Sequence, residues 1–458
     1  MFNKFQLLVL LFSINLSNAQ LNPLISSFLQ NKIKVGTYYV SGNSTAISNG
    51  VLFNCQKVEY SATSVYITAT GIPAYPTGPF LDGNPSKATN QNAIFKFPLN
   101  PVENKGTPTA TTGGNIGIFI NGVALFDYRD GVAWNATTNS LCGGPGNPPC
   151  PGGMGTVQDW NRDAILAERG GFDCSKAHPA MGNYHHHQNP SAFKLDLKVI
   201  SNVCNLYDAD GLYAIDSTKH SPLLGFAYDG FPIYGAYGYK NVDGTGGIVR
   251  IKSSYSLRNI TLRNTSPTGS AVSSGPIVSP TYPLGYFRED YQYKTTTAAT
   301  PDYLDEHNGR FCITPEYPKG IYCYFTTVDA NWNSTYPYVV GPTFYGVFAN
   351  RKVTSVNEQT TVYEPTTTGY SDSKGETLEV NLFPNPSYDF IVVQILGLNK
   401  ENLLIELFDL SGKLVRSSTI NPGATNTYLD TKTLYEGSYI VKISGSKSSV
   451  IRNVVLSK

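Results

Sequence analysis

The stretch NIGIFINGVALFDY, Asn115–Tyr128, places apolar residues at alternate positions on both sides of an Asn-Gly pair. Ile116 and Ile118 belong to the alternation before the pair, and the pattern resumes after it. Alternation of period two predicts strands with one buried face, and Asn121-Gly122 favours the two positive-φ positions of a type I′ turn. The stretch therefore predicts a β-hairpin.

The same strand-and-turn pattern extends through the region 21–130, for example in SVYITATGI, Ser64–Ile72. One segment breaks it: TVQDWNRDAILAERGG, Thr156–Gly171, contains the strong helix formers AILAE and ends at a Gly-Gly pair. Thr156 and Asp159 have the spacing of an acidic capping box, so we expect one short helix here. The fold class expected is mostly β.

The composition is that of a globular, β-rich extracellular chain. It has 458 residues, of which 31 are tyrosine and only 15% are charged. Aromatic residues fit pleated, half-buried surfaces, and Gly and Pro supply the turns. With 34 basic and 33 acidic side chains, the sequence has no excess of positive charge for nucleic acid or an anionic membrane.

The first 19 residues predict a secretory signal peptide. Lys4 precedes an apolar run from Phe5 to about Phe12, and small residues stand at Ser17 and Ala19. No later apolar stretch approaches the roughly 18 residues of a membrane helix, so no integral membrane segment is expected. The location expected is secreted or on the outer cell surface.

The chain divides by composition into three further regions. Residues 20–353 are β-rich, and residues 354–376 are polar and turn-rich, as in a linker. Residues 377–458 contain short alternating strands that predict a small immunoglobulin-like β-sandwich.

The seven cysteines of an exported chain indicate disulfides. No pair has the C-x-x-C spacing of a closed zinc site, so the alternative of thiolate ligands is disfavoured. Proximity along the sequence favours three pairs and leaves Cys55 unpaired; the pairs are Cys142–Cys150, Cys174–Cys204 and Cys312–Cys323.

Three of the six histidines are consecutive, in GNYHHHQNP, Gly182–Pro190. In an extended segment His185 and His187 share one face while His186 points the other way. Two imidazoles on one face are a metal-chelating arrangement, and imidazole suits copper and zinc. The third ligand expected is His178, His220 or Asp229. A Tyr/His hydrogen-bond network is the alternative; three adjacent histidines are harder to satisfy that way, which favours metal.

Two other groups of residues have chemical interest. An aromatic block near residue 230 is either a wall that stacks on sugar rings or a packed core. A loop near residue 308 combines carboxyl, amide and guanidinium groups. The binding residues expected from these groups and from the histidine stretch are Tyr184, Tyr228, Phe231, Tyr234, Asn308 and Arg310.

The tail resembles the C-terminal sorting domain of type IX secretion substrates. The resemblance is carried by LFPNPSYDF (Leu382–Phe390), ELFDLSGKLV (Glu406–Val415), LYEGSYIVKI (Leu434–Ile443) and the terminus at Lys458. It implies export through the type IX secretion machinery, with the tail usually removed.

A longer region, about 160–346, resembles the YHYH-domain proteins. The matching segments include Asp173–Pro190, Ser221–Tyr239 and Asp305–Phe325. The tetrad of the family name falls on residues 184–187, with His186 where the second Tyr would stand. The resemblance implies a secreted β-rich domain and brings no established reaction.

Three hypotheses of function follow. The first is histidine-based binding of copper or zinc. The second is a non-catalytic module that binds an extracellular glycan or surface through its aromatic residues. The third is a metal-independent hydrolase using Asp229, Asp305 or Glu306, and it ranks last because nothing in the spacing indicates that any two of these carboxyls meet. Motifs of the G-x-S-x-G and H-E-x-x-H types are absent from the sequence.

Overall fold

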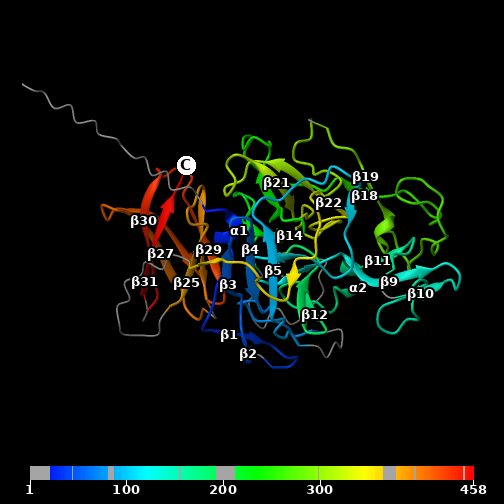
Figure 1. Cartoon of the computed structure of the whole chain (residues 1–458), viewed down its shortest axis with the longest axis horizontal. Coiled ribbons are helices and arrows are strands. Elements are labelled where there is room, and N and C mark those ends of the chain that lie inside the picture. The colour runs from blue at the N-terminus through cyan, green and yellow to red at the C-terminus, as the bar shows by residue number, and fades with distance from the viewer. Residues whose placement is uncertain are drawn as a thin grey trace, which may run out of the picture.

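The computed structural model describes residues 21–457 except 44, 81–86, 154–155, 192–211, 298, 365–377, 397–398 and 447–448. The expected signal peptide lies outside the described residues. The fold is mostly β: a body of several sheets, with the C-terminal strands forming a sandwich at one end (Figure 1). No helix among the described residues is long and apolar enough to cross a membrane.

An eight-stranded sheet forms the centre of the body. In spatial order its strands are β12 (Ala177–Ala180), β13 (Asn183–His186), β8 (Ala124–Phe126), β7 (Asn115–Phe119), β14 (Leu223–Ala227), β15 (Pro232–Tyr234), β21 (Ile321–Phe325) and β20 (Gly309–Cys312). The predicted hairpin supplies the two strands that lie between β13 and β14. It therefore joins the histidine strand to the aromatic block.

The turn of this hairpin differs from the type I′ turn expected. Only Gly122 has a positive φ, at +78°, and the amide of Gly122 donates to the carbonyl of Phe119 at 2.8 Å. Asn121 instead accepts a hydrogen bond from the amide of Val123 at 3.1 Å. This is a longer loop with glycine at its last position, a common alternative for hairpins.

A five-stranded sheet packs against the central one. Its order is β23 (Lys352–Val353), β5 (Ala93–Pro98), β4 (Ser64–Ala69), β3 (Cys55–Tyr60) and β24 (Thr361–Tyr363). The rings of Phe97 on β5 and Phe226 on β14 lie 6.5 Å apart in a shared core. Strand β24 falls within the segment expected to be a linker, so pairing with β3 continues beyond residue 353.

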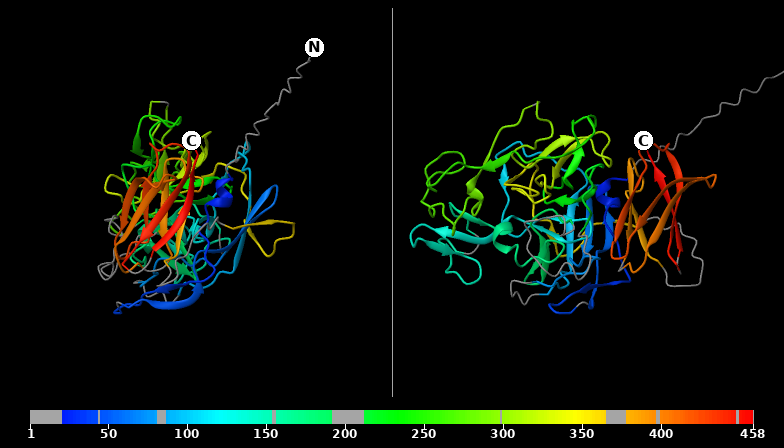
Figure 2. Two further views of the ribbon diagram at one scale, coloured as in Figure 1. Left: turned by 90° about the vertical axis from the view of Figure 1, so that its left-hand side faces the viewer. Right: turned by 180° about the vertical axis from the view of Figure 1, so that it is seen from behind.

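Smaller sheets complete the body (Figure 2). They are β10 (Ser140–Cys142), β9 (Arg129–Asn135) and β11 (Asn161–Asp163); β1 (Val35–Tyr38) with β2 (Ile47–Leu52); β16 (Tyr237–Tyr239) with β17 (Ile248–Arg250); β18 (Tyr255–Leu257) with β19 (Tyr291–Tyr293); and β22 (Thr343–Phe344) with β6 (Thr109–Ala110).

The expected helix is shorter than its sequence pattern and begins later. Helix α2 (Ala164–Glu168) is capped by Asp163, whose Oδ1 accepts from the amides of Ile165 and Leu166. The capping pair expected at Thr156 is wrong, because strand β11 occupies the residues between it and the helix. A second short helix, α1 (Pro23–Ser26), was not expected.

The C-terminal region is a two-sheet sandwich with its own hydrophobic core. One sheet has the order β25 (Val380–Phe383), β26 (Phe390–Ile395) and β29 (Asn426–Asp430); the other has β28 (Leu414–Ile420), β27 (Leu403–Asp409), β30 (Gly437–Ser444) and β31 (Ser449–Leu456). Hydrogen bonds join it to the body, such as Lys34 Nζ to the carbonyl of Leu396 at 2.7 Å.

The cysteines follow the expected pairing in part. Cys142 and Cys150 form a disulfide, and Cys55 is free and buried, as predicted. Cys174 is disulfide-bonded, and its expected partner Cys204 lies outside the described residues.

The third expected disulfide is wrong, because Cys312 and Cys323 are free thiols. Strands β20 and β21 pair with Cys312 opposite Ile321 and Cys323 opposite Arg310. The cysteines are therefore diagonal neighbours, and their thiols lie close enough to interact, which lowers the pKa of Cys312, but they form no bond.

Candidate functional site

Strand pairing brings three histidines together. Strands β12 and β13 are antiparallel neighbours, and their register places His178 directly opposite His185. His187 follows β13 on the same face as His185, because side chains alternate along an extended chain. One imidazole nitrogen from each of the three lies within 4.8 Å of the other two. His185 and His187, which were predicted to share one face, thus form a buried cluster with His178, one of the three candidate third ligands. This cluster is called here the histidine triad.

Backbone carbonyls orient two of the rings. Nδ1 of His185 lies 2.8 Å from the carbonyl of Asn183, and Nδ1 of His187 lies 2.5 Å from the carbonyl of Asp127. A carbonyl only accepts, so each Nδ1 carries the proton and, in the neutral ring, each Nε2 presents a lone pair. The two Nε2 atoms face each other at 3.0 Å. Two lone pairs at this distance require a shared proton or a cation between them.

His178 completes the triad with unused hydrogen-bonding capacity. It is 6% exposed, its Nδ1 has no hydrogen-bond partner among the described residues, and its Nε2 lies 3.2 Å from Oε2 of Glu168. Buried polar atoms of this kind call for an explanation, for which an ion is one of the usual choices.

Glu168 is the member of the site that the sequence analysis missed. It is the last residue of α2, and its Oε2 lies 3.2 Å from Nε2 of His178 and 3.2 Å from Nε2 of His187. From the sequence, AILAE predicted only a helix, with no role for its glutamate. The available signal was that the helix ends ten residues before His178 and leads the chain to the histidine strands.

Burial and mutual charge shape the protonation of the cluster. Burial lowers the pKa of His185 well below its ordinary value, and the positive charges of His187 and His178 lower it further. Burial also opposes the charged form of His187, but the hydrogen bond and charge of Glu168 outweigh it and raise the pKa of His187. Burial opposes ionisation of Glu168, yet its contacts with His178 and His187 hold its pKa far below the ordinary range.

His186 faces away from the triad, as predicted from the alternation. Its Nε2 lies 2.9 Å from the hydroxyl of Tyr75, and its Nδ1 lies 3.3 Å from the carbonyl of Lys176. Burial lowers its pKa to about 3. His186 is therefore a neutral, structural histidine of the core.

The other two residues expected as third ligands do not join the triad. His220 packs its ring against Tyr234 and Tyr239, and its Nδ1 bonds the carbonyl of Ser221 at 2.7 Å. Asp229 accepts from the hydroxyl of Tyr324 and the amide of Gly346. Both expectations are wrong because strands β14 and β15 lie farther along the sheet, beyond β8 and β7 from the histidine strands.

The expected binding surface of aromatic residues is also wrong. Tyr184 and Tyr234 are fully buried, and the two others, Tyr228 and Phe231, are at most 5% exposed. They pack in the shared core of the body, so they offer no face for a sugar ring. The block is a packed core, the alternative that the sequence left open.

Asn308 and Arg310 have structural roles as well. Asn308 donates to the carbonyls of Phe325 and Val339 at 3.0 and 2.9 Å. Arg310 donates to the carbonyls of Lys240 and other residues while it remains 7% exposed. Both side chains are buried and bond the backbone, which is a structural role.

Buried tyrosine hydroxyls are repeatedly paired with buried carboxyl groups. Four such pairs are present among the described residues: Tyr184–Asp173, Tyr234–Glu316, Tyr338–Asp163 and Tyr324–Asp229. Tyr322 pairs in the same way with the half-buried Asp305. This use accounts for part of the high tyrosine content, because each hydroxyl satisfies a carboxyl that would otherwise be costly to bury. Two of the three carboxyls considered for a hydrolase, Asp229 and Asp305, are bonded to tyrosine hydroxyls in this way. The third, Glu306, lies on the surface with its side chain 55% exposed.

Glu316 makes the stability of the fold depend on pH. Burial raises its pKa from 4.5 to about 7, although the hydroxyl of Tyr234 partly opposes this. The folded chain then holds a proton that the unfolded chain has released, so its contribution is complete below pH 4.5 and is lost as the pH rises through about 7.

We expect Glu316→Gln to flatten the pH dependence of the free energy of unfolding. Glutamine does not titrate, so between about pH 5 and pH 7 the decline with rising pH should lessen by up to roughly 1.4 kcal/mol per pH unit. Urea unfolding at several pH values measures the slope. Equal slopes for the two proteins would show that this carboxyl has the same pKa in the folded and unfolded chains.

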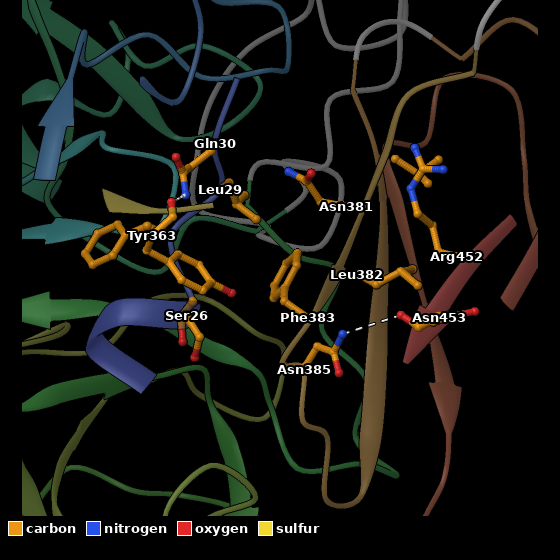
Figure 3. Close-up of a pocket in the computed structure, with 13 residues that line it drawn as sticks. Ser26, Leu29, Gln30, Tyr363, Asn381, Leu382, Phe383, Asn385, Arg452 and Asn453 are labelled. Carbon is orange, nitrogen blue, oxygen red and sulfur yellow. Dashed lines mark hydrogen bonds between the residues drawn. The ribbon is translucent and has the colours of Figure 1, made fainter. Parts of the chain in front are cut away.

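A pocket lies elsewhere, between the body and the sandwich (Figure 3). Its walls are the segment Ser26–Gln30 with Tyr363 on one side, and Val380–Phe383 with Arg452 on the other. Neither histidine nor carboxylate side chains line it. It therefore lacks the groups needed to hold a metal ion or to act as an acid or base.

Comparison with known proteins identifies the sandwich. The secretion system C-terminal sorting domain matches residues 381–457. This domain marks proteins that are secreted or attached to the outer cell surface, and it implies interaction with the type IX secretion machinery. No curated protein matches the chain.

The body is identified in the same way. The YHYH protein model matches residues 94–337, which is more than half of the chain and begins well before the region expected from the sequence. It includes the hairpin, helix α2 and every member of the histidine site. The chain therefore belongs to the YHYH protein family.

Proposed function

We propose that this secreted protein binds one copper or zinc ion through His178, His185 and His187. The observation that carries the proposal is the convergence of one nitrogen from each ring within 4.8 Å in a buried site. Ligands at roughly 2.0–2.1 Å from a tetrahedral ion stand about 3.3 Å apart, close to the separation of the two facing Nε2 atoms.

The hydrogen bonds around the triad support a metal over a purely structural network. Metal-binding histidines generally donate their other ring N–H to a carbonyl or carboxylate, as His185 and His187 do here. A structural network would satisfy every buried ring nitrogen. Nδ1 of His178 has no hydrogen-bond partner among the described residues.

The donor set favours copper and zinc. Imidazole nitrogen suits both ions, and no thiolate belongs to the cluster. Burial holds His185 in its neutral form, which is the form that binds a metal. His178 on β12 and His185 on β13 are held by the pairing of the two strands, and His187 follows directly after β13, so little reorganisation is needed for binding.

Elemental analysis of the full chain, produced without a polyhistidine tag, tests the proposal. We expect about one equivalent of copper or zinc, as isolated or after incubation with the ion, because the triad forms one site. His185→Ala/His187→Ala should remove it. Circular dichroism shows whether the variant is folded.

The matched control is His307→Gln, which changes a histidine outside the triad. Nδ1 of His307 lies 2.7 Å from the hydroxyl of Thr343, so its role is structural. This variant should keep the full metal content. A wild-type chain that neither contains nor takes up either ion would contradict the proposal and leave the histidines with a structural role.

A further inference from the structure

Glu168 places a fourth donor atom beside the histidine triad. Its Oε2 is buried and lies 3.2 Å from Nε2 of His178 and 3.2 Å from Nε2 of His187. The facing Nε2 atoms of His185 and His187 are 3.0 Å apart. These three separations are nearly equal, and they approach the separation of about 3.3 Å expected between two ligands of one tetrahedral ion.

Protons alone do not account for these contacts. The carbonyl of Asp127 fixes the proton of His187 on Nδ1, so Nε2 of the neutral ring carries a lone pair. That nitrogen faces both Nε2 of His185 and the carboxylate oxygen of Glu168. A proton added to Nε2 of His187 could point fully at one of these two neighbours, and the other contact would remain between two acceptors. A cation among the donor atoms is attracted to all of them.

Phenyl rings occupy other sides of the triad. The ring of Phe126 stacks on His185 with centroids 3.7 Å apart. The ring of Phe172 lies 5.0 Å from that of His178 and 6.3 Å from that of His187. Phenyl carbons are not metal ligands, so among these neighbours the carboxylate of Glu168 is the one that offers a ligand atom.

The four donors come from two parts of the fold. Glu168 is the last residue of α2, which packs against β9 and β11 of the three-stranded sheet. His178 and His185 lie on β12 and β13, at the edge of the eight-stranded sheet. An ion bound by all four residues would therefore join the helix to the edge of the central sheet. Closure by four protein ligands is typical of structural metal sites.

We propose that Glu168 is the fourth ligand of the ion, through Oε2, and that it closes the site as a structural metal centre. This inference rests on the proposed function and gives the ion a role, which is to hold α2 against strands β12 and β13. A carboxylate oxygen is an ordinary zinc ligand. Its negative charge also compensates part of the charge of a buried ion.

Competition with a chromogenic chelator compares the zinc affinity of the full chain with that of Glu168→Ala. We expect the variant to bind zinc at least about tenfold more weakly, because groups that merely orient a ligand already contribute roughly 10–100-fold. Alanine favours helix, so α2 should persist, and circular dichroism checks the fold. The matched control is Glu306→Ala, which removes a carboxylate 4.0 Å from Nε2 of His307, outside the triad. Its zinc affinity should equal that of the wild type.

Water-proton relaxation distinguishes a ligand from a charge that is only nearby. Water that binds copper(II) directly and exchanges with solvent raises the relaxation rate of the bulk water, so the copper(II)-loaded chain reports an open coordination position. We expect a low rate per bound copper in the wild type and a higher rate in Glu168→Ala. The side chain of Glu168 is 25% exposed, so its removal should admit water to the ion.

Equal relaxation rates in the wild type and Glu168→Ala would overturn the inference, and so would an unchanged zinc affinity or an equal loss of affinity in Glu306→Ala. Each of these results would leave metal binding by the triad intact. A wild-type chain that takes up neither zinc nor copper would instead overturn the proposed function, and this inference with it.

Discussion

Replacing His178 with glutamine is expected to lower the affinity for copper or zinc by at least about 100-fold, because loss of groups that only support a ligand already costs 10–100-fold. His178 supplies the third imidazole, from the strand opposite His185. Glutamine has similar length but is a much weaker ligand for these ions than imidazole. Competition with a chromogenic chelator measures the affinity of each protein.

His220→Gln is the matched comparison, since His220 was the other histidine expected as a third ligand. It is 5% exposed, and Nε2 has no partner among the described residues, so the two histidines are alike in burial and in unused nitrogen. Only His178 belongs to the triad. The metal affinity of His220→Gln should therefore stay within about twofold of the wild type, a much smaller change than the loss of a ligand would cause. A large loss in His220→Gln, with none in His178→Gln, would contradict the assignment.

The sequence predicted the part of this site that depends on local geometry. Alternation along an extended chain placed His185 and His187 together and His186 apart, and the structure confirms both. Choosing among His178, His220 and Asp229 was beyond a local pattern. That choice depends on which strands are neighbours and in which register, and only the pairing of β12 with β13 decides it.

Glu168 was missed for a similar reason. A glutamate at the end of a short helix looks like an ordinary surface residue, since Glu is a good helix former. Its role follows from the packing of α2 beside the histidine strands, which brings Oε2 within 3.2 Å of two rings. The periodicity of AILAE does not contain that information.

The aromatic block shows the limit of composition as evidence. A tyrosine-rich run fits a ligand-binding wall and a packed core equally well, because the difference lies in what covers it. Here the five-stranded sheet covers it, and Phe97 on β5 contacts both Phe226 and Tyr228. The hydroxyls then need buried partners far along the chain, such as Asp163 for Tyr338.

Replacing Gly225 with alanine is expected to lower the free energy of unfolding by about 3 kcal/mol or more, at the upper end of overpacking costs. Gly225 lies on β14, where it pairs with Phe119 on β7. A Cβ there would stand 2.2 Å from the carbonyl oxygen of Ile118 and 2.7 Å from Cα of Phe119. Both obstacles are backbone atoms of the neighbouring strand, so no side chain can rotate to relieve them.

The contact is crowded from both strands. At Gly117 on β7, an added Cβ would stand 2.9 Å from the carbonyl oxygen of Phe226 on β14. The hairpin strand of Asn115–Tyr128 therefore requires glycine at its junction with β14. Separating the two strands would disturb the centre of the eight-stranded sheet, and with it the position of β13 beyond β8.

Gly113→Ala is the control, because Gly113 precedes β7 and a Cβ there meets no atom within 4 Å. Its stability should stay within about 0.5 kcal/mol of the wild type, as for most surface substitutions. Urea unfolding followed by tyrosine fluorescence should place the midpoint of Gly225→Ala roughly 1 M below both. Midpoints that coincide for all three proteins would mean that β7 and β14 do not approach this closely, and the pairing that joins the histidine strand to the core would need revision.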